Sequence, residues 1–261
     1  MCWKWIKELF KPDPMEHQQK LLLSFACNNY PGMANDLNGC INDQKNIVDN
    51  LYEFTARTFS NSEVTKRTFI DEIEKALGMA EAGDVIVIHY SGHGSFGLDP
   101  TKTEADGYSE CLYLYDGPFW DREFMEILAL IPDGVKVVVI LDSCFSFGAT
   151  TRKLRNPYNK PRFIQFQDIN PEIPIKRNVL HRSSLKHVLL AGCGERQTSA
   201  DAYINGSYNG AFTWFAMATL NRGFTYKEWH AEIRKYLPSD DFSQKPELEG
   251  PEELLTNQIL Q

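Results

Sequence analysis

The hydrophobic positions of the chain concentrate in four short apolar runs separated by stretches of mixed polarity. The runs are Lys20–Ala26, Asp84–Tyr90, Val135–Leu141 and His187–Ala191. Each is almost continuously apolar, and the middle two are rich in β-branched residues. This pattern is typical of strands that are buried on both faces of a sheet.

Apolar residues at helical spacing lie between and after these runs. The helical faces are Ile47, Val48, Leu51 and Phe54; Phe69, Ile70, Ile73 and Leu77 after Thr68 as N-cap; Phe124, Ile127, Leu128 and Ile131 before Pro132; and a helix through Leu237 opened by a Thr225/Glu228 capping box. Strands alternating with helices predict an α/β fold with a mostly parallel central sheet and helices on both faces. In such sheets the active site lies beyond the carboxyl ends of the strands.

Composition narrows the function classes. The 261 residues are 43% hydrophobic and 24% charged, an ordinary globular balance, and the net charge of −8 argues against nucleic acid as the main partner. No apolar run reaches the about 18 residues needed to span a membrane. Residues 1–10 alternate aromatic and charged side chains, and we expect an N-terminal extension over residues 1–18 that packs on the domain or anchors it to a membrane or partner.

The six cysteines show no Cys-x-x-Cys spacing, so neither a zinc site nor a disulfide framework is indicated. We therefore expect a cytoplasmic protein whose cysteines are mostly small buried side chains. The sequence leaves the oligomeric state open.

Two candidate catalytic residues follow neighbouring apolar runs. His93 lies between Gly92 and Gly94 after the second run, and Cys144 follows the third. A nearby histidine can take the proton of a cysteine thiol and later protonate the leaving amine. The backbone amides of Gly94 and Cys144 are the candidate oxyanion donors. Alone, Cys144 would be interpreted as a buried structural thiol, but the paired motifs favour catalysis.

The segment Gly92–Gly97 also satisfies the dinucleotide-binding spacing of glycines. That fingerprint must open a helix whose N-terminus holds the pyrophosphate. No helical pattern follows until about residue 121, so we do not expect a nucleotide site.

The motifs together resemble metacaspases and their bacterial relatives over roughly residues 20–235. Cys144 follows His93 by 51 positions. The matching segments are Asn38–Asp43, Tyr90–Gly94, Asp106–Cys111, Asp142–Ser146, Gly192–Asp201 and Gly210–Thr213, with Phe145 and Phe147 as departures beside the cysteine. The resemblance implies a caspase-like fold and a cysteine endopeptidase. It implies a peptidase domain over 19–237, with a large-subunit-like half at 19–148, a linker at 149–184 and a small-subunit-like half at 185–237. The residues after Pro238 are polar and acidic, so we expect a loosely held tail over 238–261.

The resemblance also implies an acidic substrate pocket. The positions that match the family's pocket are Cys40, Asp43, Ser91 and Asp142. Two carboxylates in a partly desolvated pocket favour a cationic side chain, so we expect cleavage after Arg or Lys in protein or peptide substrates. Two simpler interpretations stay open: Asp43 solvated on a helix, and Asp142 capping a turn.

The linker over residues 149–184 carries eight basic residues against two acidic ones. They are Arg152, Lys153, Arg155, Lys160, Arg162, Lys176, Arg177 and Arg182. An enzyme that cleaves after Arg or Lys could cleave itself here as a maturation step. An ordinary exposed loop explains the same composition equally well.

Many metacaspases require calcium, but the matching carboxylates are incomplete. Only Asp121 matches, whereas Ser109, Trp120 and Thr151 occupy positions where aspartate is expected. The nearby acids Glu104, Asp106, Glu110 and Asp116 could contribute oxygens, but a solvated acidic loop is the simpler interpretation. We predict no cofactor and activity that does not depend on calcium.

Two alternative functions stay open. The first is an inactive caspase homologue that acts as a scaffold or binding module. The second is a transpeptidase or an asparaginyl peptidase of the same architecture, although an acidic pocket argues against asparagine.

Overall fold

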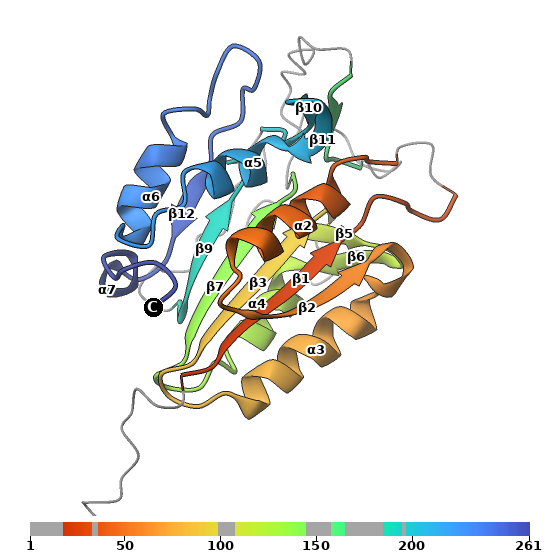
Figure 1. Cartoon of the computed structure of the whole chain (residues 1–261). Helices are drawn as coiled ribbons and strands as arrows, with labels where there is room; N and C mark the ends of the chain where they lie inside the picture. Colours follow the sequence, from red (N-terminus) through yellow and green to blue (C-terminus); the bar gives the residue numbers. More distant parts are fainter. Residues whose placement is uncertain (1–17, 33–35, 99–107, 145–157, 165–184, 195–196) are drawn as a thin grey trace, which may run out of the picture.

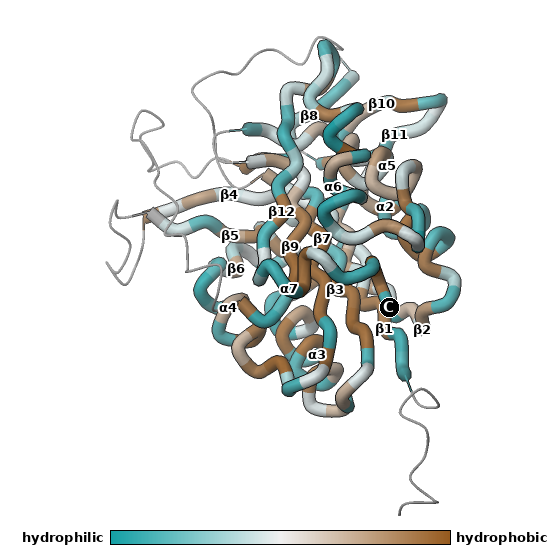
Figure 2. The backbone as a smooth tube through the Cα atoms, turned by 90° about the vertical axis from the view of Figure 1, so that its left-hand side faces the viewer, coloured by the Kyte–Doolittle hydropathy of each residue, from teal (hydrophilic) through white to brown (hydrophobic). Residues whose placement is uncertain are grey.

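The computed structural model describes residues 18–32, 36–98, 108–144, 158–164, 185–194 and 197–261. Its centre is a six-stranded sheet in the order β12-β9-β7-β3-β1-β2. The parallel strands are β1 (Lys20–Ala26), β2 (Thr55–Ser60), β3 (Val85–Ser91), β7 (Lys136–Asp142) and β9 (His187–Ala191), whereas β12 (Glu247–Glu249) is antiparallel. The four strands predicted from the apolar runs are confirmed to within one residue. Figure 2 shows β3, β7 and β9 as a hydrophobic centre.

Helices cover both faces of this sheet, as the alternating pattern predicts. One core contains α3 (Lys66–Met79) and α4 (Asp121–Leu128), which pack on side chains such as Phe25. The other contains α2 (Cys40–Asn50), α5 (Ala211–Ala218) and α6 (Tyr226–Ile233), which pack on side chains such as Leu22. Successive residues of a strand point to opposite faces, so the continuous apolar run of β1 serves both cores. In Figure 1, α2 and α5 lie in front of the sheet and α4 behind it.

Several helix boundaries differ from the sequence-based expectation. The apolar faces through Phe54 and Ile131 belong to helices that already end at Asn50 and Leu128. The cap of α3 is Thr65, whose side chain accepts a hydrogen bond from the Thr68 amide, so the helix begins three residues earlier than expected. The capping box of Thr225 and Glu228 is confirmed. The helix that it opens ends at Ile233 rather than Leu237.

Two three-stranded sheets flank the carboxyl ends of the central strands. One joins β4 (His93–Leu98), β5 (Tyr108–Leu114) and β6 (Gly117–Trp120), and the other joins β8 (Lys160–Pro161), β10 (Ala200–Ile204) and β11 (Ser207–Gly210). The short helices η1 (Asn61–Glu63) and α7 (Glu252–Leu255) complete the described elements. The residues that follow Gly92 form strand β4, not a helix, which agrees with the exclusion of a dinucleotide site.

The C-terminal segment is part of the fold, and the expectation of a loosely held tail over 238–261 is wrong. Strand β12 pairs with β9 and extends the central sheet. The side chains of Ile259 and Leu260 are fully buried in the core that also contains α6. These apolar residues are few and surrounded by polar ones, so the segment's composition concealed its packing.

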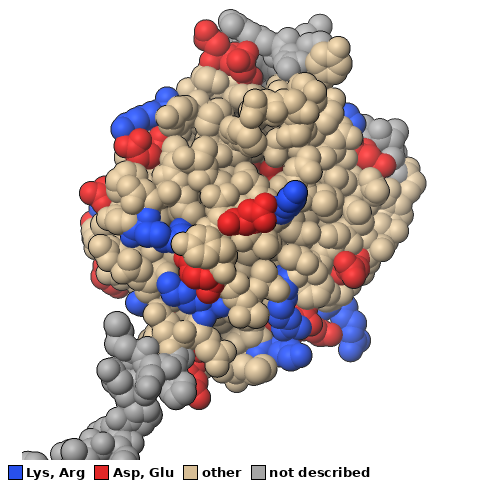
Figure 3. All heavy atoms as spheres, viewed as in Figure 1, with Lys and Arg blue, Asp and Glu red and all other residues tan. Residues whose placement is uncertain are grey.

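Among the described residues, no helix is both long enough and apolar enough to cross a membrane. On the face shown in Figure 3, acidic and basic side chains are scattered among larger uncharged areas of the described surface. Residues 1–17 lie outside the described residues, so the predictions for the N-terminal extension stay untested.

Candidate active site

The two catalytic motifs meet at the carboxyl edge of the central sheet. Strands β3 and β7 are paired neighbours, and Ser91 at the end of β3 lies opposite Asp142 at the end of β7. His93 and Cys144 each follow two residues later, and both are buried. A Cβ atom at Gly94 would overlap the Cys144 carbonyl oxygen. Glycine therefore permits the close approach of the two motifs.

Two tyrosines hold the backbone of His93. Its amide donates to the Tyr30 hydroxyl at 2.9 Å, and its carbonyl oxygen accepts from the Tyr90 hydroxyl at 2.9 Å. The rings of Tyr30 and His93 lie 5.0 Å apart. Strand β1 positions this support, because Tyr30 follows its end and packs in the same core as Tyr90.

The thiol of Cys144 lies against the backbone of Ser199. The Ser199 amide donates to Sγ at 2.6 Å, and Sγ lies 3.3 Å from the Ser199 carbonyl oxygen. Burial raises the pKa of the Cys144 thiol well above its ordinary value, and the neighbouring Cys193 raises it further. The thiol is therefore neutral in this enclosed state, and its ionisation requires a proton acceptor or solvent access.

The acidic pocket is filled by the protein's own Arg162, whose side chain is completely buried. Its Nη1 lies 3.3 Å from an Asp142 carboxylate oxygen and donates to the Ser91 hydroxyl at 2.8 Å. Its Nη2 lies 2.7 Å from Asp43 and 3.2 Å from Asp201. Burial opposes the charge of the guanidinium, but the surrounding acidic groups, Asp142 first among them, raise its pKa well above the ordinary value.

The carboxylates of Asp43 and Asp142 are held in place by donors from the α5 side of the pocket. Asp43 accepts from the Gly210 amide at 2.7 Å, and Asp142 accepts from the amide and hydroxyl of Thr213 at 2.8 Å each. Burial raises the pKa of Asp43 to about 7, against the opposing effect of Arg162. Neither simpler interpretation holds, because both aspartates are fully buried and paired with one guanidinium.

The structure brings all four predicted pocket residues to Arg162. Ser91 bridges the guanidinium and Asp43, since its hydroxyl also donates to Asp43 at 2.7 Å. Cys40 begins α2 and is buried beside the same group, where burial raises the pKa of its thiol and the charge of Arg162 opposes the shift. The guanidinium faces three carboxylates, so the pocket keeps an excess of negative charge.

Asp201 is the pocket residue that the sequence did not assign. It lies in β10 and is fully buried. The motif Gly192–Asp201 was noted as a whole, without a role for its last residue. The signal available in the sequence was an aspartate at the end of a motif that matches the family. Its complete burial is known only from the structure, and carboxylates are almost never fully buried unless paired.

The backbone of Arg162 is hydrogen-bonded to the residues around the candidate nucleophile. Its carbonyl oxygen accepts from the Gly94 amide at 3.0 Å and from the Cys144 amide at 3.2 Å. Its own amide donates to the Ser199 carbonyl oxygen at 3.0 Å. Ile164 then donates to the Gly94 carbonyl at 3.1 Å. The two predicted oxyanion donors thus converge on one carbonyl oxygen of the chain's own linker.

The expectation of an ordinary exposed loop is wrong for Arg162. Lys160, two residues earlier, is exposed, and its ammonium donates to the Asp36 carbonyl at 2.7 Å. The other six candidate cleavage residues of the linker lie outside the described residues. Sequence composition could not distinguish Arg162 from them, because its partners come from β7, α2 and β10.

The calcium prediction stays untested. Asp121 is exposed at the start of α4, and Glu110 is buried in β5. Glu104 and Asp106 lie outside the described residues, together with Thr151.

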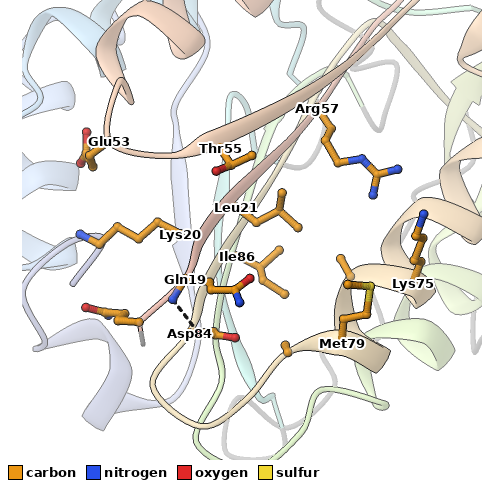
Figure 4. Close-up of a pocket in the computed structure, with 13 residues that line it drawn as sticks. Gln19, Lys20, Leu21, Glu53, Thr55, Arg57, Lys75, Met79, Asp84 and Ile86 are labelled. Atoms are coloured by element: carbon orange, nitrogen blue, oxygen red, sulfur yellow. Dashed lines mark hydrogen bonds between the residues drawn. The ribbon is translucent and has the colours of Figure 1, made fainter. Parts of the chain in front are cut away.

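A separate cavity of about 600 Å³ lies at the opposite end of the central strands (Figure 4). It is lined by residues such as Lys20 at the start of β1, Thr55 at the start of β2 and Ile86 near the start of β3. The candidate catalytic residues follow the other ends of β3 and β7, so this cavity is distinct from the candidate active site.

Comparison with known proteins identifies the family of this chain. The family model described as caspase domain (Peptidase C14) matches residues 19–253. The chain belongs to the caspase domain family. The match extends past residue 237, in agreement with the packed C-terminal segment.

Among curated relatives, metacaspase-1 of Schizosaccharomyces pombe is 27% identical over 84% of this chain and 64% of its own length. Metacaspase-7 of Arabidopsis thaliana is 29% identical over 64% of this chain and 44% of its own length. The chain thus spans about two thirds or less of the length of these metacaspases.

Two solved structures show the same fold. A crystal structure of a protein from Geobacter sulfurreducens superposes with a TM-score of 0.71 at 25% identity, covering 92% of this chain and 98% of that one. Caspase-1 from Spodoptera frugiperda superposes with a TM-score of 0.63 at 12% identity, covering 92% of this chain and 88% of that one, and shows the fold alone. The predicted α/β caspase-like fold is confirmed.

Proposed function

We propose that this protein is a cysteine endopeptidase that cleaves after Arg or Lys, with Cys144 as nucleophile and His93 as general acid and base. The observation that carries the proposal is the position of Arg162. Its cationic side chain fills the acidic pocket while its carbonyl oxygen accepts hydrogen bonds from the Gly94 and Cys144 amides. This arrangement corresponds to a peptide substrate bound through the residue that precedes the cleaved bond.

The proposed reaction proceeds through a thioester on Cys144. His93 takes the thiol proton, and the Cys144 sulfur attacks the carbonyl carbon of the basic residue. The Gly94 and Cys144 amides stabilise the negative charge that develops on the carbonyl oxygen. His93 then protonates the leaving amine, and water hydrolyses the thioester with His93 as base.

The first substrate, on this proposal, is the bond between Arg162 and Phe163 of the same chain. The linker keeps the pocket occupied until that bond is cut, because no second basic side chain can enter a site that Arg162 fills. Among the linker's basic residues, Arg162 is the one whose charge and carbonyl both engage the site in the described residues. The excess carboxylate charge of the pocket supports selection of cationic side chains in other substrates as well.

For substrates, cofactors and location, the proposal keeps the expectations drawn from the sequence. We propose protein or peptide substrates with exposed Arg or Lys, no cofactor, no dependence on calcium, and a cytoplasmic location. The five described cysteines, Cys27, Cys40, Cys111, Cys144 and Cys193, form no disulfide, which is compatible with a reducing compartment.

The test is hydrolysis of fluorogenic peptides that end in Arg, Lys, Asp or Asn. It uses the wild type, Cys144→Ala, and Cys111→Ala as a matched control that removes a buried cysteine in β5. Arg162→Gln is included because it lacks the side chain that fills the acidic pocket, so peptides can enter without prior self-cleavage. We expect hydrolysis of the Arg and Lys peptides by all proteins except Cys144→Ala.

Other outcomes assign other functions. Hydrolysis of the Asn peptide alone would indicate an asparaginyl peptidase. No hydrolysis by the wild type or by Arg162→Gln would contradict the proposal and favour a scaffold.

A further inference from the structure

The pocket contacts the guanidinium at two separate nitrogens. Nη1 donates to Ser91 and to the Asp142 carbonyl at 3.1 Å, and it faces the Asp142 carboxylate. Nη2 faces two different carboxylates, those of Asp43 and Asp201. The site is therefore shaped for a planar group with two ends, not for a single point charge.

Asp201 is held in position independently of the guanidinium. Its Oδ2 accepts from the Asn38 amide and its Oδ1 from the Gly39 amide, at 2.8 Å each. A Cβ atom at Gly39 would lie 2.5 Å from Oδ1, so only glycine leaves room for the carboxylate. These amides directly precede α2, the helix that carries Asp43. The backbone thus orients Asp201 towards the Nη2 position before a substrate arrives.

Resting on the proposed cleavage after basic residues, we propose that Asp201 makes the pocket select arginine over lysine. A lysine side chain has one terminal nitrogen, which cannot occupy the Nη1 and Nη2 positions together. Lysine bound beside Asp142 leaves Asp43 and Asp201 without their cation in a buried site, and such unpaired charge is costly. Removing Asp201 removes part of the contact to arginine and part of the penalty against lysine.

The test compares Arg and Lys peptides that are otherwise identical, with kcat/KM measured for wild type, Asp201→Asn and Asp49→Asn. Asp49 is exposed on α2, so its variant removes the same charge away from the pocket. We expect Asp201→Asn to lower kcat/KM for the Arg peptide at least ten-fold and for the Lys peptide by less than three-fold, while Asp49→Asn leaves both unchanged. If the role of Asp201 were purely structural, Asp201→Asn would lower kcat/KM equally for both peptides, and that result would overturn the inference.

A measurement on the unmodified pocket covers the case in which Asp201→Asn does not fold. Agmatine and cadaverine both carry an ammonium at one end of a similar alkyl chain, whereas the other end is a guanidinium in agmatine and an ammonium in cadaverine. We expect agmatine to inhibit the self-cleaved wild type at a concentration at least ten-fold lower than cadaverine does. Equal inhibition would overturn the inference while leaving cleavage after basic residues intact. If the wild type hydrolyses neither basic peptide, the proposed function itself fails, and the inference fails with it.

Discussion

The carbonyl oxygen of Arg162 accepts a hydrogen bond from the backbone amide of Cys144 at 3.2 Å. The same residue's guanidinium is paired with the carboxylate of Asp142, two positions before that cysteine. One residue of the linker thus contacts both the candidate oxyanion donors and the candidate specificity pocket.

Arg162 stabilises the uncut protein because it neutralises buried carboxylates. In the Cys144→Ala background, where cleavage is blocked, Arg162→Gln should lower the free energy of unfolding by about 3–5 kcal/mol, since it leaves charges buried without a partner. Urea unfolding measures the loss, and Lys160→Gln, two residues away and exposed, should change stability by less than about 0.5 kcal/mol. Added agmatine should restore part of the stability of Arg162→Gln. Equal stability of the two variants would show that Arg162 does not fill the pocket in solution.

The affinity of the pocket for a cation should depend on pH through Asp43. Burial raises the pKa of Asp43 to about 7 and the guanidinium of Arg162 opposes that shift, so we expect a higher pKa when the guanidinium is absent. Below pH 7 the carboxyl is protonated in both states, whereas above pH 7 binding releases its proton. Affinity should therefore rise as pH increases from about 7.

Calorimetric titration of the Cys144→Ala, Arg162→Gln double variant with an Arg peptide measures this dependence without the titration of the nucleophile. Adding Asp43→Asn should flatten the profile. A profile that stays steep in the presence of Asp43→Asn would assign the titration to another group.

The fold prediction succeeded where local pattern carries the information. The continuous apolar runs predicted β1, β3, β7 and β9 because each is buried on both faces and alternation is absent. Strand β2 was missed because it is a largely exposed edge strand of sequence Thr-Ala-Arg-Thr-Phe-Ser, which has no apolar run. Strand β12 was missed because three residues, Glu-Leu-Glu, are too few to show a period.

The sequence predicted those residues of the candidate site that belong to short contiguous motifs. The pair His93 and Cys144 follows strands that the pattern identified, and the acidic pocket followed from a family resemblance. Arg162 could not be selected from eight basic residues, since its partners Asp43 and Asp201 lie 119 and 39 positions away. Ion pairs at such separations leave no local signature, and a basic, proline-containing segment normally indicates an exposed loop.

The C-terminal segment should contribute to stability as a core element does. Ile259→Ala should lower the free energy of unfolding by about 2–5 kcal/mol, because it removes a fully buried side chain. Gln258→Ala, at an exposed neighbouring position, should change it by less than about 0.5 kcal/mol. Denaturant unfolding of both variants checks the difference. An unchanged unfolding midpoint for Ile259→Ala would indicate that residues 238–261 are a loosely held tail and do not stabilise the core.

Calcium should not change the rate of peptide hydrolysis. The incomplete set of aspartates in the sequence supports this prediction, since calcium prefers about six to eight oxygen ligands with several carboxylates among them. The rate is measured in a chelator and again after adding millimolar calcium, with magnesium as the control ion. A several-fold increase with calcium alone would contradict the prediction.

The central claim is that the uncut chain holds its own Arg162–Phe163 bond as a substrate. Intact-mass spectrometry of the purified protein, followed over time, tests it most directly, with Cys144→Ala, Arg162→Gln and Lys160→Gln run in parallel. We expect two fragments from the wild type and Lys160→Gln, one ending at Arg162 and the other beginning at Phe163. We expect no cut at that bond in Cys144→Ala or Arg162→Gln. A wild-type protein that hydrolyses Arg peptides while its Arg162–Phe163 bond stays intact would show that the chain does not hold this bond as a substrate.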